Sequence, residues 1–224
     1  MIYTHNLMKI FLDTADLNEI RAANETGLID GVTTNPTLIL RSGNSLYSTA
    51  KLLALEYPHF ESISTEVVAD TAEEMIEQAQ QYIDIGPAIT IKVPLTVEGL
   101  KACKTLSDQG VKTNVTLCFS AAQAVMAAKA GATYVSPFVG RMNDNSVSGV
   151  ELIRAITGLY CNHRVPTQVL AASLRDVHHV SRCFLYGAGV CTMPPKVFWK
   201  MYDSVLTREG LALFQADWDS INNV

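Results

Sequence analysis

Several common sequence signals are missing from this chain of 224 residues. It has no run of about 18 apolar residues, the length that a membrane helix needs, and no layout typical of a signal peptide. A surplus of positive charge is also absent, because 17 Lys and Arg face 22 Asp and Glu for a net charge of −5. We therefore expect neither a membrane nor a nucleic acid as a partner. Any bound phosphate must be held by a few well-placed Arg or Lys side chains.

Metal-ligand and disulfide patterns are missing as well. The five cysteines form no CxxC pair, and most lie in apolar surroundings, so we expect buried, reduced thiols and a reducing, cytoplasmic location. The five histidines form no HExxH or comparable spacing, so we expect no metal site.

The composition that is present describes a soluble globular protein with a substantial core. Hydrophobic residues make up 48% and charged residues 17% of the chain. No linker or low-complexity tract divides the chain, so we expect a single domain over residues 1–224. Residues 1–7 are interpreted as an N-terminal extension, with Met8 as an alternative natural start.

Short apolar, β-branched segments alternate with helical patterns along the whole chain, at a spacing of roughly 25 to 30 residues. The expected strands are residues 8–12, 31–34, 62–68, 88–93, 112–117, 133–137, 167–172 and 190–193. Such alternation favours a parallel sheet, and eight units favour an α/β fold of the (β/α)8 TIM-barrel type. An amphipathic helix over residues 208–222 follows. A doubly wound open sheet is the alternative, disfavoured because no glycine-rich phosphate loop follows any strand.

The fourth expected strand contains an unusual residue. Lys92 stands between Ile91 and Val93, and Pro94 ends the strand. A buried ammonium is costly, so such a lysine tends to become a nucleophilic amine, as Schiff-base chemistry on a carbonyl requires. The alternative is a lysine on an edge strand that points into solvent.

Polar residues recur where the expected strands end, and in a TIM barrel those ends form the active site. They are Asp13, Thr33, Asn35, Glu66, Lys92, Asn114, Thr116, Ser136, Ser173 and Arg175, with Arg141 in a polar loop over residues 140–145. Burying any of these polar side chains costs desolvation free energy, so their repeated placement at strand ends indicates a function.

These residue types suit one chemistry. Asp13 and Glu66 could share acid–base work, one on the substrate hydroxyl and one on water at the imine. Thr33, Asn35, Thr116 and Ser173 could be hydrogen-bonding partners without adding charge. Arg141 and Arg175 offer fork-shaped donors for a phosphate at the far end of the substrate.

Four of these segments resemble the transaldolase family, and most closely its small subfamily, which also contains fructose-6-phosphate aldolases. They are FLDT at 11–14, GVTTNP at 31–36, IKVP at 91–94 and AAS at 171–173. The likeness runs in the same order from about residue 8 to residue 218. It implies a barrel enzyme that needs no metal and no organic cofactor and acts on small sugar phosphates.

The resemblance also implies roles for individual residues. Lys92 corresponds to the Schiff-base lysine, Asp13 to the acid–base residue for carbon–carbon cleavage, and Glu66 with Thr116 to the pair that holds the reacting water. The resemblance places Asn35, Asn114 and Ser136 around a dihydroxyacetone unit, and Arg141, Ser173 and Arg175 around a phosphate.

Small members of the family resemble ring-forming homo-oligomers, for which a decamer is one candidate assembly, with a C-terminal helix that reaches a neighbour. Residues 213–218 (LFQADW) fit that part. The alternative is a helix that closes its own barrel.

Two positions separate transferase from lyase within the subfamily. Aldolase members resemble one another in having Gln where this chain has Glu66 and Tyr where it has Phe138. Phenylalanine has no hydroxyl to protonate a bound enamine, so the resemblance favours a transaldolase of the non-oxidative pentose phosphate pathway. A fructose-6-phosphate aldolase is the first alternative. A barrel without catalysis, acting as a binding or assembly module, is the second.

Overall fold

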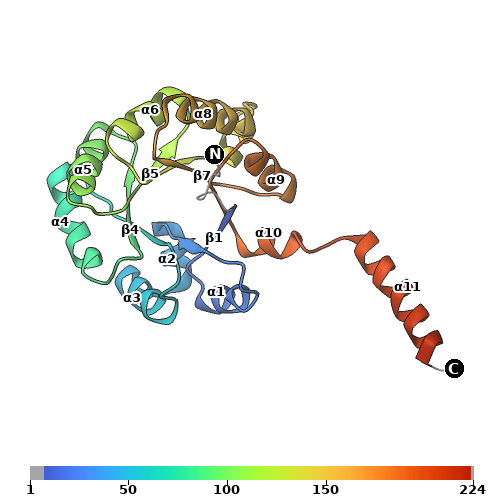
Figure 1. Cartoon of the computed structure of the whole chain (residues 1–224). Helices are drawn as coiled ribbons and strands as arrows, with labels where there is room; N and C mark the ends of the chain where they lie inside the picture. Colours follow the sequence, from blue (N-terminus) through green and yellow to red (C-terminus); the bar gives the residue numbers. More distant parts are fainter. Residues whose placement is uncertain (1–7, 223–224) are drawn as a thin grey trace.

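The computed structural model describes residues 8–222. The expected extension over residues 1–7 lies outside the described part. Eight parallel strands close into a barrel in the order β1 to β8, which confirms the predicted TIM-barrel class (Figure 1). The strands are β1 Lys9–Asp13, β2 Gly31–Thr33, β3 Ser62–Glu66, β4 Ile89–Pro94, β5 Thr113–Cys118, β6 Tyr134–Pro137, β7 Gln168–Ala171 and β8 Val190–Met193.

The strand register brings the polar strand ends to one level of the barrel. Asp13 of β1 is opposite Thr33 of β2. Glu66 of β3 is opposite Lys92 of β4, which in turn is opposite Asn114 of β5. These side chains therefore meet at the carboxyl end of the barrel, as the sequence predicted.

Helices cover the outside of the barrel, and most begin at a residue whose side chain accepts from the first turn. Asp16, Ser45, Thr96, Ser120 and Asp176 all cap helices in this way. The helices are α1 Leu17–Asn24, α2 Pro36–Ser42, α3 Leu46–Glu56, α4 Ala72–Ile83, α5 Val97–Asp108, α6 Ala121–Lys129, α7 Val139–Asp144, α8 Gly149–His163, α9 Val177–Leu185, α10 Pro195–Lys200 and α11 Val205–Asn222.

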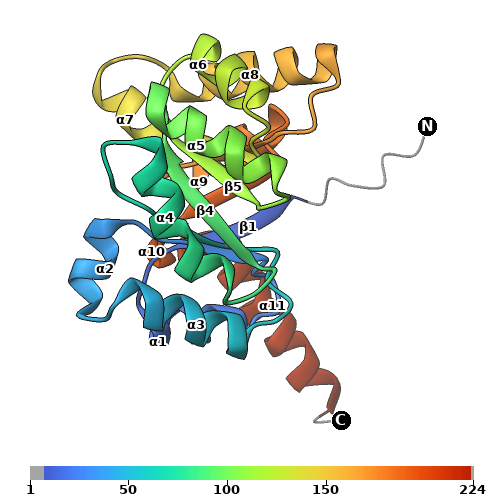
Figure 2. The same ribbon diagram turned by 90° about the vertical axis from the view of Figure 1, so that its left-hand side faces the viewer.

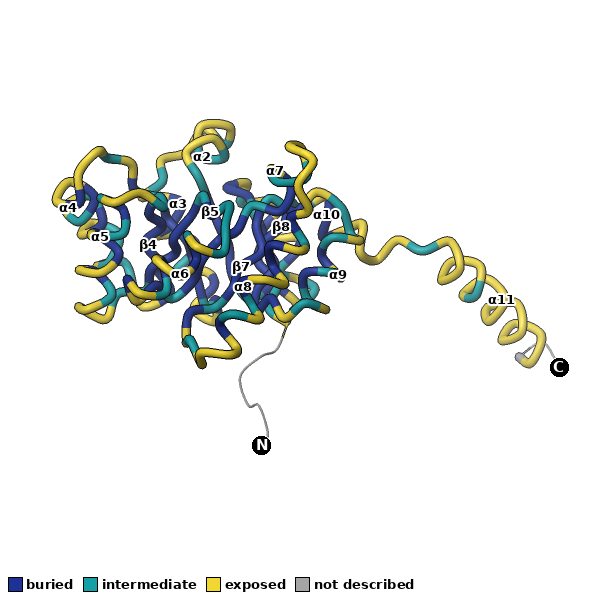
Figure 3. The backbone as a smooth tube through the Cα atoms, turned by 90° about the horizontal axis from the view of Figure 1, so that it is seen from above, coloured by how far each residue is buried: buried dark blue, intermediate teal, exposed yellow. Residues whose placement is uncertain are grey.

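Two short helices were not expected. α2 begins directly after β2 because Asn35 stays extended before proline while its side chain caps Leu38 N, and Pro36 fits a first turn. The predicted polar loop over residues 140–145 was wrong: Arg141 lies on α7. Both helices lie at the same end of the barrel in two perpendicular views (Figures 2 and 3). They build walls around the carboxyl ends of the strands.

The C-terminal helix α11 points away from the barrel (Figures 1 and 3). It begins three residues before the predicted start, and every residue from 205 to 221 except Gly210 is exposed. Large apolar side chains are among them, with Leu211 at 62% and Phe214 at 72% exposure. The alternative that this helix closes its own barrel is therefore wrong.

The core has two parts. A large apolar layer lies between the sheet and the helices, and a small cluster fills the barrel interior. In that inner cluster Phe11 meets Tyr134 edge-on, with ring centroids 6.0 Å apart. Below them Glu61 accepts from Tyr134 at 2.6 Å and from Lys9 at 2.7 Å. These side chains form a floor toward the amino end of the barrel. Among the described residues, no helix has the length and apolar character needed to cross a bilayer.

Candidate active site

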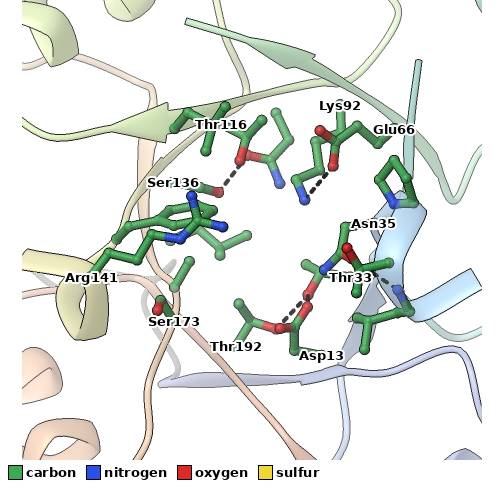
Figure 4. A pocket seen from close by; sticks show the side chains of 18 of the residues that line it. Asp13, Thr33, Asn35, Glu66, Lys92, Thr116, Ser136, Arg141, Ser173 and Thr192 are labelled. Carbon is green, nitrogen blue, oxygen red and sulfur yellow. Dashed lines mark hydrogen bonds and ion pairs between the residues drawn. The ribbon is translucent and has the colours of Figure 1, made fainter. Parts of the chain in front are cut away.

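A cavity of about 630 Å³ opens at the carboxyl ends of the strands (Figure 4). All twelve residues singled out from the sequence line it: Asp13, Thr33, Asn35, Glu66, Lys92, Asn114, Thr116, Ser136, Phe138, Arg141, Ser173 and Arg175. They come from all of the strands except β8 or from the segments that follow them, so the barrel alone brings them together.

Lys92 lies in the wall of this cavity with only 6% of its surface exposed. Its Nζ is 2.9 Å from Glu66 Oε2 and donates to the carbonyl oxygen of Thr34 at 3.1 Å. The alternative of a solvent-facing edge-strand lysine is therefore wrong. The amine is oriented by two acceptors, and Glu66 is close enough to take its proton.

Asp13 faces Lys92 from the other side of the cavity (Figure 4). Burial raises the pKa of the Asp13 carboxyl above its usual range, and the nearby charge of Glu66 acts in the same direction. The charge of Lys92 and a hydrogen bond from Thr33 partly offset that rise in pKa. Thr33 Oγ1 donates to Asp13 Oδ1 at 2.8 Å. A carboxyl with a raised pKa suits a group that takes up and returns a proton.

Thr116 has a buried hydroxyl that makes no hydrogen bond with any described residue. Such an orphaned group in a cavity wall is suited to hold a water or a substrate atom. The next residue, Leu117, has φ of 61°, a rare left-handed conformation, where the register between β5 and β6 shifts. Strain of this kind is typical of functional sites, and no residue pattern predicted it here.

Two asparagines in the wall are fixed by their own hydrogen bonds. Asn114 accepts from Ser136 Oγ at 2.6 Å and donates to Ser64 Oγ at 3.3 Å. Asn35 uses its side-chain oxygen to accept from Leu38 N at 3.0 Å. Only the amide NH₂ of Asn35 is therefore left to donate to a ligand.

Arginines stand at the rim of the cavity. The Arg141 guanidinium lies 5.0 Å from the Phe138 ring centroid, and Arg175 pairs with Asp144 at 2.5 Å. Ser173 is held in a left-handed conformation with φ of 57°. Gly140 donates to the Ser173 carbonyl oxygen at 3.0 Å, an approach that leaves no room for a side chain.

Sequence reasoning missed three notable cavity residues, Arg41, Leu117 and Thr192. Thr192 follows the pattern used for the others, since it is a polar residue near the end of β8. Arg41 lies on the unexpected helix α2, so nothing in the sequence placed it at the cavity. Within residues 8–222 no group of three His, Cys, Asp or Glu side chains could hold a metal ion.

Comparison with known proteins agrees with this geometry. Residues 10–224 match the family described as transaldolase/fructose-6-phosphate aldolase. A protein of Paracoccus denitrificans named probable transaldolase is 52% identical over 94% of this chain and 96% of its own length. Proteins with the same name from Dinoroseobacter shibae and Roseobacter denitrificans are 49% and 50% identical, each over 95% of this chain and 97% of their own length. The chain therefore belongs to the transaldolase/fructose-6-phosphate aldolase family.

Proposed function

We propose that the protein is a transaldolase, a transferase of the pentose phosphate pathway. It converts sedoheptulose 7-phosphate and glyceraldehyde 3-phosphate reversibly into erythrose 4-phosphate and fructose 6-phosphate. The observation that carries the proposal is the buried Lys92 amine, 2.9 Å from Glu66 in a polar barrel mouth. Relatives at about half identity over nearly the whole chain are named probable transaldolase, which supports the same activity.

The first step joins the sugar to the enzyme. Lys92 gives a proton to Glu66, and its nitrogen adds to the C2 ketone to form a carbinolamine. Loss of the C2 hydroxyl as water leaves a protonated imine. Glu66 supplies the proton for that water, and the Thr116 hydroxyl holds it in place. The same pair delivers water when the imine is hydrolysed at the end.

The second step breaks a carbon–carbon bond. Asp13, as a carboxylate, takes the proton of the C4 hydroxyl, the C3–C4 bond breaks, and the electron pair moves toward the iminium nitrogen. The products are an aldehyde and an enamine of dihydroxyacetone on Lys92. An incoming aldehyde then accepts the C3 carbon of the enamine while Asp13 returns its proton to the new hydroxyl.

Substrate recognition is divided between the two ends of the sugar. Asn35, Asn114 and Ser136 hold the hydroxyls of the dihydroxyacetone unit. At the other end Arg141, Ser173 and Arg175 hold the phosphate.

Whether the enzyme is a transferase or a lyase depends on whether the enamine persists until an acceptor aldehyde binds. Phe138 lines the cavity with its ring between Phe119, whose centroid is 5.7 Å away, and the Arg141 guanidinium. It offers no hydroxyl to protonate the enamine, so a transferase is favoured over a fructose-6-phosphate aldolase. We expect Phe138→Tyr to raise acceptor-free cleavage of fructose 6-phosphate. An unchanged cleavage rate in that variant contradicts this argument.

Two measurements test the activity. Borohydride reduction with fructose 6-phosphate should add mass at Lys92 and not in Lys92→Met. Fructose 6-phosphate consumption should require erythrose 4-phosphate, and rapid cleavage without it indicates the lyase. Absence of any adduct would support the alternative of a barrel that only binds or assembles. That alternative is disfavoured because all twelve polar and aromatic residues singled out from the sequence line one cavity.

The assembly proposal concerns α11. We expect one domain over residues 1–224 that forms a homo-oligomer, a ring such as a decamer, in which the apolar side chains of α11 are buried by a neighbouring copy. The cytoplasm is the expected location, and no metal or organic cofactor is required. Sedimentation should show an oligomer that Phe214→Ser weakens. A monomeric unaltered protein contradicts the assembly.

A further inference from the structure

Thr192 of β8 has no role in the proposed reaction, yet its hydroxyl is tied to the proton carrier. Its side chain is 2% exposed, and its Oγ1 is 2.7 Å from Thr33 Oγ1, which in turn is 2.8 Å from Asp13 Oδ1. The three side chains therefore form a hydrogen-bonded row, and Figure 4 shows them close together at one side of the cavity. The register fixes this row, because β1 lies between β2 and β8 and pairs with both.

The hydrogen bonds in this row have a direction, since each hydroxyl carries one hydrogen. When Asp13 is a carboxylate, Thr33 donates to it and accepts from Thr192. When Asp13 is protonated at Oδ1, the oxygen that Thr33 contacts, the new hydrogen points at Thr33 Oγ1, and the Thr33 hydrogen needs another acceptor. Thr33 is itself 2% exposed, and Thr192 Oγ1 lies 2.7 Å away, where it can accept that hydrogen.

We propose that Thr192 is a positioning residue whose hydroxyl reverses its hydrogen bond to Thr33 each time Asp13 gains or loses a proton. It donates in one state and accepts in the other, so neither state leaves a buried hydrogen without a partner. Thr192 itself lines the cavity, toward which its own hydrogen can turn. The inference rests on the proposed function insofar as Asp13 is the proton carrier.

Other charges face Asp13 and must be kept constant in any test. Lys92 of β4 favours the carboxylate, and Glu66 of β3 opposes it. Neither is altered by a substitution at Thr192. A valine there has the same shape as threonine, so it also leaves no space for a water.

Thr192→Val should disfavour the protonated state of Asp13, because the Thr33 hydrogen then loses its acceptor only in that state. A buried donor without an acceptor shifts such an equilibrium by roughly tenfold, which lowers the pKa of Asp13 by about one unit. The acid limb of the rate of sugar cleavage should move to lower pH by the same amount. Thr192→Ser keeps the hydroxyl and should restore the unaltered values.

The test is a ¹³C NMR titration of the enzyme labelled at aspartate carboxyl carbons, without substrate, with the Asp13 signal assigned by its loss in Asp13→Asn. Thr65→Val is the matched control, because Thr65 is equally buried, carries an orphaned hydroxyl and lies outside the cavity. We expect a lower midpoint in Thr192→Val alone.

A midpoint in Thr192→Val that equals the unaltered one, or that rises, overturns the inference. If that variant does not fold, Thr192→Cys serves, and a weaker shift in the same direction is expected. The titration needs no turnover. It therefore tests the role of Thr192 separately from the transaldolase activity, which the borohydride experiment tests.

Discussion

Replacing Asp13 by asparagine separates the two halves of the proposed reaction. The amide has the shape of the carboxyl and still accepts from Thr33, but it cannot carry a proton. Turnover should fall by about 10²- to 10⁴-fold, the usual contribution of a positioned acid–base group. Imine formation should persist, because Lys92, Glu66 and Thr116 are untouched.

The same substitution should make the fold more stable. Burial raises the pKa of Asp13, so the folded protein holds its carboxylate at a cost relative to the unfolded chain. Each unit of raised pKa corresponds to about 1.4 kcal/mol. In a domain of this size each kcal/mol moves the melting temperature by about 2–4 °C. The neutral amide avoids that cost.

The stability gain should depend on pH with a definite sign. Below the unfolded pKa of aspartate, about 3.9, both states of the unaltered protein are protonated and the gain vanishes. It should grow as the pH rises toward the raised pKa of folded Asp13 and be complete above it. Melting curves at a series of pH values between about 4 and 8 measure this difference.

The assay combines three readouts on one set of proteins: turnover, borohydride-trapped mass with fructose 6-phosphate, and melting temperature. Asp30→Asn is the control, because Asp30 accepts from Ile10 N at 2.8 Å beside the amino end of the barrel. It should leave turnover unchanged. The reasoning is refuted if Asp13→Asn loses the trapped adduct along with turnover, keeps full activity, or melts lower than the unaltered protein at neutral pH.

Two further variants probe the walls of the cavity. Gly140→Ala would place a methyl group 2.2 Å from the Ser173 carbonyl oxygen and 2.9 Å from Arg175 Nε, so KM for phosphorylated sugars should rise by about tenfold with a stability loss of about 1–3 kcal/mol. Gly158→Ala, which meets nothing within 4 Å, should not lower stability, and equal effects of the two refute the steric argument. Thr116→Val removes an orphaned buried hydroxyl, so it should slow turnover by about tenfold or more without lowering the melting temperature. A large loss of stability there means that the hydroxyl is structural.

Sequence signals for the start of a helix are strong where a single residue decides the local conformation. Side chains that cap a first turn, such as those of Asp16 and Ser45, act through a hydrogen bond to a residue two or three positions further along the chain. The strand expected over residues 31–34 stops before Pro36, but the helix α2 that begins at Pro36 was not predicted. The dipeptide Asn35-Pro36 can both end a strand and start a helix. The residues that follow it decide whether that helix continues.

Most residues of the candidate site could be predicted from the sequence, because the carboxyl ends of all strands of a barrel lie around the same opening. A polar residue at the end of each buried strand must face the same opening once the sheet closes, so Asp13, Glu66 and Lys92 could be grouped without knowing any distance. Thr192 obeys the same rule and was overlooked.

The sequence by itself determined the alternation of strands and helices and the residue types at the strand ends, since both follow from local pattern and spacing. Only the tertiary structure decided what those residues do to one another. The pairing of Lys92 with Glu66, the burial that raises the pKa of Asp13 and the row of hydroxyls from Thr192 to Asp13 join residues from 20 to 159 positions apart. Such contacts depend on the register of a closed sheet, which no short stretch of sequence specifies.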